Sequence, residues 1–264
     1  MASDRLGWIF DTAASNYAQM RPGYVDELYR DIFSYAPIDE SSEVVEVGIG
    51  GGQATLPFLQ RGCTLTAVEY GKHFSEICRE KFEGYDKFSV ITGKFEETEF
   101  AKESFDLIYS ASAFHWVPEE IGYPKVFSML KGGGVFVRFA NHPFEDKGRP
   151  QLADEIQKLY KIYMPYSPRP VEYGERDAKQ RADIAAKYGF KDIGFRLYHR
   201  TRTFSAKEYV ALLGTYSDHL ALERGIREEF FSKIEELIDE YGGQFTLYDT
   251  IDLQLARKPR CSGT

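Results

Sequence analysis

This chain has few cysteines, no excess of basic charge and no long apolar runs. Its three cysteines, Cys63, Cys78 and Cys261, are odd in number, widely spaced and without metal-ligand spacing. They argue against a disulfide framework and indicate a reducing compartment, and we expect no metal. Asp4 and Arg5 stand near the N-terminus and no long apolar stretch follows them. We therefore expect no signal peptide or membrane span, and a cytoplasmic location.

The charge balance is acidic. The 264 residues include 33 Lys and Arg against 41 Asp and Glu, a net charge of −8, with no basic stretch. This balance disfavours a nucleic-acid backbone as partner, so we expect a small-molecule substrate, no nucleic acid and no membrane, in a monomer or homodimer. Hydrophobic residues make up 43% of the chain, enough for a globular protein to bury a full core.

Apolar runs bounded by glycine or charge predict strands, and the segments between them predict helices. Strand patterns lie at 43–48, 63–69, 88–92, 105–110 and 134–140, and again at 190–203 and 244–257. Helical patterns lie at 25–35, 53–61, 72–82, 123–130, 206–213 and 226–241. The alternation in the first two thirds is typical of a parallel sheet that helices cover on both faces.

Four segments follow from these patterns. Residues 1–140 are predicted to form an α/β core, 141–188 a helical cap or insertion, 189–257 the rest of the core sheet with substrate-side helices, and 258–264 a disordered tail. The strand pattern disappears in segment 141–188, which holds five prolines. Long insertions of this kind are usually functional, commonly lids; the alternative is a decorative helical hairpin.

The most informative motif lies at the end of the first predicted strand, Val44-Val45-Glu46-Val47-Gly48-Ile49-Gly50-Gly51-Gly52-Gln53. Glycine at 48, 50 and 52 permits positive φ and lets a ligand approach the peptide groups. The dinucleotide fingerprint requires its third glycine or alanine three residues after the second, and Gln53 stands there. No Lys-Ser/Thr pair follows to form a phosphate loop. The motif therefore indicates a cofactor site and disfavours NAD.

Further candidate ligand groups follow the other predicted strands, where open parallel sheets bind their ligands. Glu69 follows the second strand and suits a ribose diol, and Tyr70 suits stacking on a base. The segment at 92–97 follows the third. Small residues at 110–113 follow the fourth, and then three large rings, Phe114-His115-Trp116. A surface acid remains the alternative interpretation of Glu69.

These motifs resemble those of class I S-adenosylmethionine-dependent methyltransferases. The matching residues are Glu46-Val47-Gly48-Ile49-Gly50-Gly51-Gly52, Glu69, the segment 93–97 before Phe100, Phe105-Asp106-Leu107-Ile108, Phe114-His115-Trp116-Val117 and Leu130-Lys131-Gly132-Gly133-Gly134-Val135. The segment from Tyr17 through Arg21-Pro22 to Tyr24 is similar to that of the small-molecule branch with trans-aconitate methyltransferase and the methyltransferase type 11 domain. The resemblance covers residues 10–140 well and the later strands weakly. It implies a Rossmann-like seven-stranded mixed sheet, order 3-2-1-4-5-7-6 with the last strand antiparallel.

The resemblance also implies S-adenosylmethionine as cofactor and S-adenosylhomocysteine as product. Gly48, Gly50 and Gly52 would pass under the methionine part, flanked by Glu46 and Gln53, and Glu69 would bind the ribose. Tyr70, Phe95 and Glu96 would frame the adenine. Ser110, Ala111 and His115 would lie near the sulfonium, and Tyr17 and Arg21 would close over the carboxylate. Lys94 departs from the pattern, since relatives often have aspartate there, and this departure shifts the adenine amino contact to Glu96 or the backbone.

Methyl transfer from a sulfonium mainly requires aligned reactants in a dry pocket. A hydroxyl acceptor needs a base, for which His115 is the best-placed titratable group; a carboxylate acceptor needs none. Trp116 and Tyr216 are the predicted substrate-binding residues, Tyr216 being favoured over His219. We expect O-methylation of a carboxylate or hydroxyl. The alternatives are a regulatory module that binds the cofactor without catalysis, and an NAD-dependent oxidoreductase.

Overall fold

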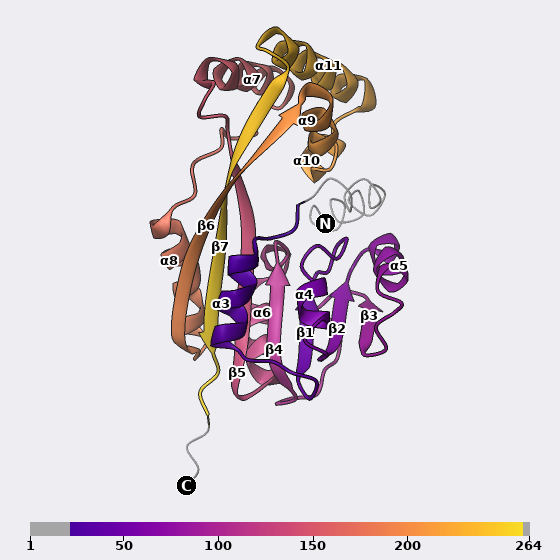
Figure 1. Ribbon diagram of the computed structural model, residues 1–264, viewed down its shortest axis with the longest axis vertical. Helices are drawn as coiled ribbons and strands as arrows, with labels where there is room; N and C mark the ends of the chain where they lie inside the picture. Colours follow the sequence, from indigo (N-terminus) through magenta and orange to yellow (C-terminus); the bar gives the residue numbers. More distant parts are fainter. Residues whose placement is uncertain (1–21, 261–264) are drawn as a thin grey trace. The chain divides into compact units, whose positions relative to one another are not determined.

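The structure, a computed structural model, describes residues 22–260 (Figure 1). The chain divides into two compact units. Within the described range, residues 22–141, 174–198 and 251–260 form the first, here called the core unit, and residues 142–173 and 199–250 form the second unit. Each unit has its own hydrophobic interior, so each is described by itself.

Seven strands form one mixed sheet in the order β3-β2-β1-β4-β5-β7-β6, which confirms the predicted fold (Figure 1). The strands are β1 (Glu43–Val47), β2 (Thr64–Glu69), β3 (Phe88–Thr92), β4 (Phe105–Ala111), β5 (Leu130–Phe144), β6 (Lys191–Ser205) and β7 (Gln244–Arg257). The pairs β1–β2, β1–β4, β2–β3 and β4–β5 are parallel. The last three strands have residues in both units.

The central strands are apolar on both faces, as expected of a parallel sheet covered on both sides. Val44 pairs in register with Leu107, and both belong to one hydrophobic cluster. The next pair, Val45 and Ile108, belongs to a second cluster. Because successive side chains point to opposite faces of a sheet, this alternation places one cluster on each face of the core sheet.

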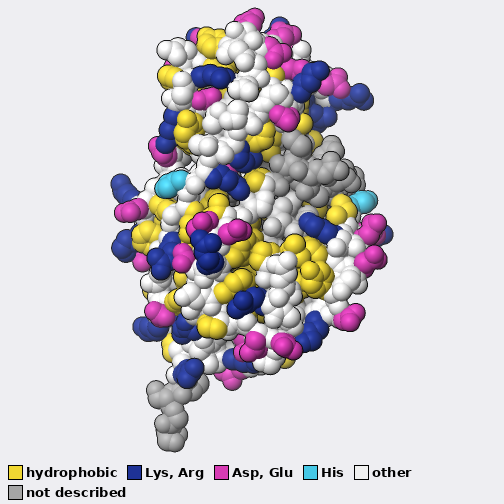
Figure 2. All heavy atoms as spheres, viewed as in Figure 1, with side chains coloured by type: hydrophobic (Ala, Val, Ile, Leu, Met, Phe, Trp, Pro, Cys, Tyr) yellow, Lys and Arg dark blue, Asp and Glu magenta, His cyan; other side chains and the backbone are white. Residues whose placement is uncertain are grey.

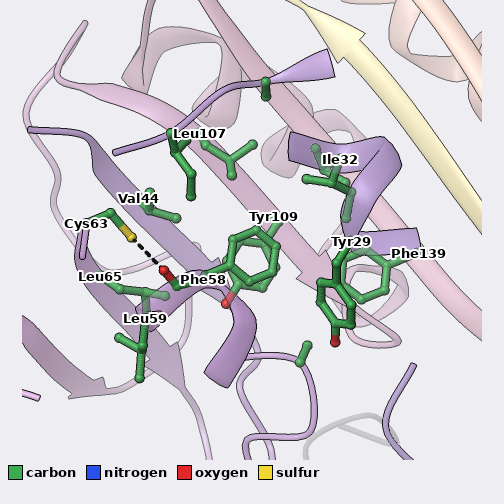
Figure 3. Packing of buried hydrophobic residues seen from close by; sticks show 14 of the residues in the cluster. Tyr29, Ile32, Val44, Phe58, Leu59, Cys63, Leu65, Leu107, Tyr109 and Phe139 are labelled. Atoms are coloured by element: carbon green, nitrogen blue, oxygen red, sulfur yellow. Dashed lines mark hydrogen bonds between the residues drawn. The ribbon is translucent and has the colours of Figure 1, made fainter. Parts of the chain in front are cut away.

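Helices complete the two clusters. The first receives side chains of α3 (Asp26–Tyr35), α4 (Leu56–Leu59) and α5 (Lys72–Lys81). Figure 3 shows part of it, where Phe58 stacks on Tyr109 with ring centroids 3.9 Å apart. The second cluster receives side chains of α6 (Glu119–Met129) and α8 (Glu175–Lys187). On α3, Leu28, Tyr29 and Ile32 are the buried residues, the apolar face that the sequence pattern predicts.

The second unit contains α7 (Pro150–Tyr163), α9 (Ala206–Leu213), α10 (Ser217–Leu220) and α11 (Arg224–Glu240) around a third cluster. Helix α9 begins where a capping box predicts it, because Ser205 accepts a hydrogen bond from the Glu208 amide and the Glu208 carboxylate accepts one from the Ser205 amide. The predicted cap segment 141–188 is divided between the units, with α7 in the second and α8 in the core unit.

Some boundaries differ from the sequence pattern. The helix predicted over 53–61 is short, because residues 50–55 form turns and α4 begins only at Leu56, next to Pro57. Lys258, the first residue of the predicted tail, is buried, and its ammonium donates to the Leu130 carbonyl at 2.7 Å.

Two further observations concern the charges on the surface and the hydropathy of the helices. Basic and acidic side chains are interspersed over the face shown in Figure 2. None of the helices between residues 22 and 260 has the length and hydropathy needed to cross a bilayer.

Candidate functional site

The glycine turn follows β1 at the edge where β2 and β4 also end. Gly48, Gly50 and Gly52 all have positive φ, at 75°, 53° and 71°. A Cβ on Gly48 would lie 2.3 Å from the Cβ of Ala113, and one on Gly52 would lie 2.7 Å from the ring of Phe82. Glycine is therefore required at these two positions by the chain's own packing as well as by backbone conformation.

Side chains from β2 and α5 hold the turn in place. The Glu69 carboxylate accepts from the amides of Gly50 and Gly71, each at 2.8 Å. The ammonium of Lys81 donates to the carbonyls of Gly51 and Gly52 at 2.9 and 3.2 Å. A carboxylate oxygen can accept more than one hydrogen bond, so these contacts are compatible with the predicted ribose role.

The thiol of Cys78 also contacts the turn, donating to the Gly50 carbonyl at 3.0 Å. Burial raises the pKa of this thiol to about 12. It is therefore neutral and keeps the proton that it donates. Together with Glu69 and Lys81, Cys78 fixes the turn through protein contacts alone.

Two polar atoms beside the turn are buried without a hydrogen-bond partner among residues 22–260. One is Oε1 of Glu46 and the other is Nε2 of Gln53. The other Glu46 oxygen accepts from the hydroxyls of Thr55 and Tyr109, both at 2.8 Å. Burial raises the Glu46 pKa to about 8. An unmet buried group costs about 1–3 kcal/mol, so this pair suits a ligand that brings a donor and an acceptor.

The methionine end of S-adenosylmethionine has that chemistry, since it carries an ammonium donor and a carboxylate acceptor. The residues around the glycine turn therefore fit the cofactor that the sequence motifs indicate.

The segment after β3 is fixed by a residue that the motifs did not reveal. Lys125 of α6 donates to the carbonyls of Phe95, Glu96 and Thr98. Phe95 is buried in the second hydrophobic cluster, with 4% of its surface exposed. Tyr70 is 44% exposed, and the Lys94 ammonium lies 5.7 Å from its ring centroid. Lys94 therefore lies over the ring of Tyr70, a contact that the separation of the two residues in the sequence does not indicate.

The end of β4 meets the beginning of the glycine turn. The buried Ser110 hydroxyl donates to the Val47 carbonyl at 2.7 Å, and Ala113 packs against Gly48. His115 and Trp116 are exposed on a short 3-10 helix, Phe114–Trp116, with their rings 5.0 Å apart. The structure therefore brings the glycine turn, Glu69 and the Ser110 segment, including Ala111, to one edge of the sheet.

Three predicted residues are outside the described part of the core unit. Tyr17 and Arg21 fall outside the described residues. Tyr216 belongs to the second unit, where it directly precedes α10.

The described residues contain no group of three or more His, Cys, Asp or Glu that could hold a metal ion. Arg200 and Arg202 both bind Asp249, whose side chain is fully buried. Arg169 likewise pairs with Glu145 and Asp154. These arginines neutralise carboxylates of the same unit.

Comparisons with known proteins agree with this arrangement. The methyltransferase domain family matches residues 45–138. An uncharacterised methyltransferase of Geobacillus sp. is 32% identical over 165 residues, which are 59% of this chain and 75% of the relative. The chain belongs to the class I S-adenosylmethionine-dependent methyltransferases.

Another relative of this methyltransferase and one solved structure extend the similarity beyond the matched domain. An uncharacterised methyltransferase of Schizosaccharomyces pombe is 23% identical over 237 residues, 88% of each chain. The fold is similar to that of Haemonchus contortus phosphoethanolamine N-methyltransferase 2 in complex with S-adenosylmethionine. The TM-score is 0.54 at 15% identity, and the match covers 95% of this chain and 57% of that chain.

The methyltransferase is therefore an enzyme whose cofactor is S-adenosylmethionine, as the motifs predict. The matched domain contains Glu46, the glycine turn, Glu69, the Ser110 segment and His115. We therefore reject the two alternative functions, an NAD-dependent oxidoreductase and a regulatory module that binds the cofactor without catalysis.

Proposed function

We propose that this methyltransferase methylates an oxygen of a small molecule, either a hydroxyl or a carboxylate. The observation that carries the proposal is the exposed His115, which follows the β4 segment that packs against the glycine turn. A titratable group at that place can accept the proton of a hydroxyl acceptor. Trp116, its exposed neighbour, offers an aromatic face to the acceptor or to a cation.

The residues of the core unit would divide the work of holding the cofactor. Glu46 and Gln53 would take the ammonium and carboxylate of its methionine end, while Glu69 would take the ribose hydroxyls. Tyr70 and the segment with Phe95 and Glu96 would border the adenine. When bound, S-adenosylmethionine supplies a methyl group activated by a sulfonium.

The protein's remaining tasks are to place the acceptor oxygen and to manage its proton. With a hydroxyl acceptor, His115 would accept the hydroxyl proton as the oxygen attacks, a contribution of about 10²–10⁴-fold for a positioned base. With a carboxylate acceptor, no proton moves and His115 would be dispensable.

Calorimetric titration tests the cofactor residues. We expect wild-type protein to bind S-adenosylmethionine and S-adenosylhomocysteine and to show no comparable affinity for NAD. Glu69→Ala should weaken both interactions strongly, because it removes the ribose acceptor and the support of Gly50. Glu76→Ala, an exposed carboxylate on α5, is the matched control. Equal affinities of the two variants would contradict the role of Glu69.

Methyl-transfer assays with acceptors of different chemistry test which group is methylated and whether His115 acts as the base. Mass spectrometry would follow methylation of phenols, alcohols, carboxylates, amines and thiols of matched size. For hydroxyl acceptors, His115→Asn should lower kcat by about 10²–10⁴-fold, whereas His73→Asn, another exposed histidine, should not. Turnover of carboxylates should be unaffected by either variant. Methylation confined to amines or thiols would refute the proposal.

A further inference from the structure

A cavity of about 190 Å³ lies within the second unit. Its lining includes Ile156 and Tyr160 of α7, Tyr209 and Leu213 of α9, and Tyr216 and His219 at α10. All the described lining residues belong to this unit. The cavity lies in the part of the chain that the methyltransferase domain match leaves out.

A chain of hydrogen bonds runs along the cavity. The hydroxyl of Tyr160 lies 2.8 Å from Nε2 of His219, and Nδ1 of His219 lies 2.7 Å from the Asp218 carboxylate. Burial raises the pKa of Asp218, but the hydrogen bond and charge of His219 outweigh it, so the net shift is downward. The ionised carboxylate therefore accepts the proton of Nδ1. With a neutral imidazole, Tyr160 donates to Nε2 and its oxygen remains able to accept from a ligand.

A second tyrosine adds another hydroxyl to the cavity lining. Tyr209 lines the cavity and is only 7% exposed. Its ring packs against Phe204 and Phe245. A tyrosine hydroxyl can both donate and accept a hydrogen bond, so Tyr209 offers a second hydroxyl to a ligand in the cavity.

The lining also determines the charge that a ligand can carry. It includes the carboxylates Glu145 and Asp218, and none of its residues between 22 and 260 is a lysine or arginine. Glu145 is already paired with Arg169, and Asp218 with His219. An anion would meet two carboxylates and no lysine or arginine of the described lining, and an ammonium would find both carboxylates occupied. A neutral ligand fits best.

From these observations we infer that the cavity binds a neutral, single-ring molecule that carries a hydroxyl group. The size follows from comparison with an apolar cavity of about 150 Å³ that accommodates benzene. The ring would contact the apolar side chains, while the hydroxyl would exchange hydrogen bonds with Tyr160 and Tyr209. This inference goes beyond the proposed function and is independent of it, since it requires neither cofactor nor methyl transfer.

Ligand-observed NMR and calorimetry on the full chain, with phenol, toluene, benzoate and benzylamine as probes, test the inference. We expect phenol to bind more tightly than toluene, and benzoate and benzylamine more weakly than either. Tyr209→Phe and Tyr160→Phe should each weaken phenol binding about 3–10-fold and leave toluene binding unchanged. Tyr163→Phe, also on α7 but outside the lining, is the matched control.

Two further outcomes would overturn the assignment. One is that phenol does not bind, or that the two variants weaken phenol binding and toluene binding equally. The other is displacement of phenol by saturating S-adenosylhomocysteine, which would locate phenol in the cofactor site. Thermal melting of each variant establishes that it is folded. The cofactor titration with Glu69→Ala is a separate experiment, so either proposal can fail without the other.

Discussion

Replacing Glu46 by glutamine should make the stability of this methyltransferase less dependent on pH. Glu46 is fully buried, and its pKa in the folded protein is about 8 against an ordinary value of 4.5. Below pH 4.5 the folded and unfolded chains both hold the proton, and the favourable contribution is complete. Between pH 4.5 and 8 the unfolded chain releases the proton while the folded chain keeps it, so the free energy of unfolding falls as pH rises.

The magnitude follows from the two pKa values. Each pKa unit corresponds to about 1.4 kcal/mol, so the interval between 4.5 and about 8 corresponds to a loss on the order of 5 kcal/mol. Glutamine keeps the shape of the side chain, and its amide oxygen can still accept from Thr55 and Tyr109. The free energy of unfolding of Glu46→Gln, minus that of wild type, should therefore rise by about 1.4 kcal/mol per pH unit between pH 5 and 8.

Denaturant unfolding at half-unit pH steps measures this difference. Thermal melting should show it as roughly 2–4 °C per kcal/mol. Glu43→Gln, at the partly exposed start of the same strand, controls for loss of a carboxylate in β1. A Glu46→Gln difference that stays constant from pH 5 to 8 would refute the raised pKa.

The same carboxyl should couple cofactor binding to protons. An ammonium at Glu46 Oε1 favours the carboxylate, so binding of S-adenosylmethionine below pH 8 should release a proton. Calorimetry in buffers of different ionisation enthalpy measures that proton. Glu46→Gln should abolish the release, and release that persists in the variant would assign it to another group.

Three other substitutions test the packing of the fold. Gly48→Ala should destabilise the protein by about 2 kcal/mol or more in denaturant unfolding, because it combines positive φ with an overlap against Ala113; Gly84→Ala, with open space around it, should have little effect. Asp249→Ala leaves two arginines without their partner and should cost about 3–5 kcal/mol. Lys125→Met should weaken cofactor affinity in calorimetry by freeing the segment after β3, whereas Lys179→Met on α8 should not.

The core sheet was predictable because buried parallel strands form short continuous apolar runs. The run at 43–48 became β1, and that at 105–110 became β4. Strand β5 is longer than its pattern, 134–140, and extends over Leu130–Phe144. The added residues include Lys131-Gly132-Gly133, which resembles a turn, and residues 141–144, whose polar and proline content hides the strand. Local propensity is overridden there by pairing with neighbouring strands.

The candidate sites were predictable to different degrees for the same physical reason. Glu46 and the glycines are adjacent in sequence, so their spacing carries the signal. Lys125 acts on a segment about thirty residues away, and Tyr160 and His219 are 59 positions apart. No local pattern links such residues, since only the tertiary fold brings them together. Sequence analysis favoured Tyr216 over His219, yet both line the cavity.

The contacts of the glycine turn show that packing within the chain, as well as the approach of a ligand, accounts for its glycines. Gly48 and Gly52 face Ala113 and Phe82, and the turn is fixed by Glu69, Cys78 and Lys81. A turn held in this way has its conformation before any ligand arrives, which lowers the entropic cost of binding. The cofactor is then expected to change the state of the two buried polar atoms, on Glu46 and Gln53, more than the backbone. Proton release at Glu46 is consequently a more direct report of cofactor binding than any motion of the turn.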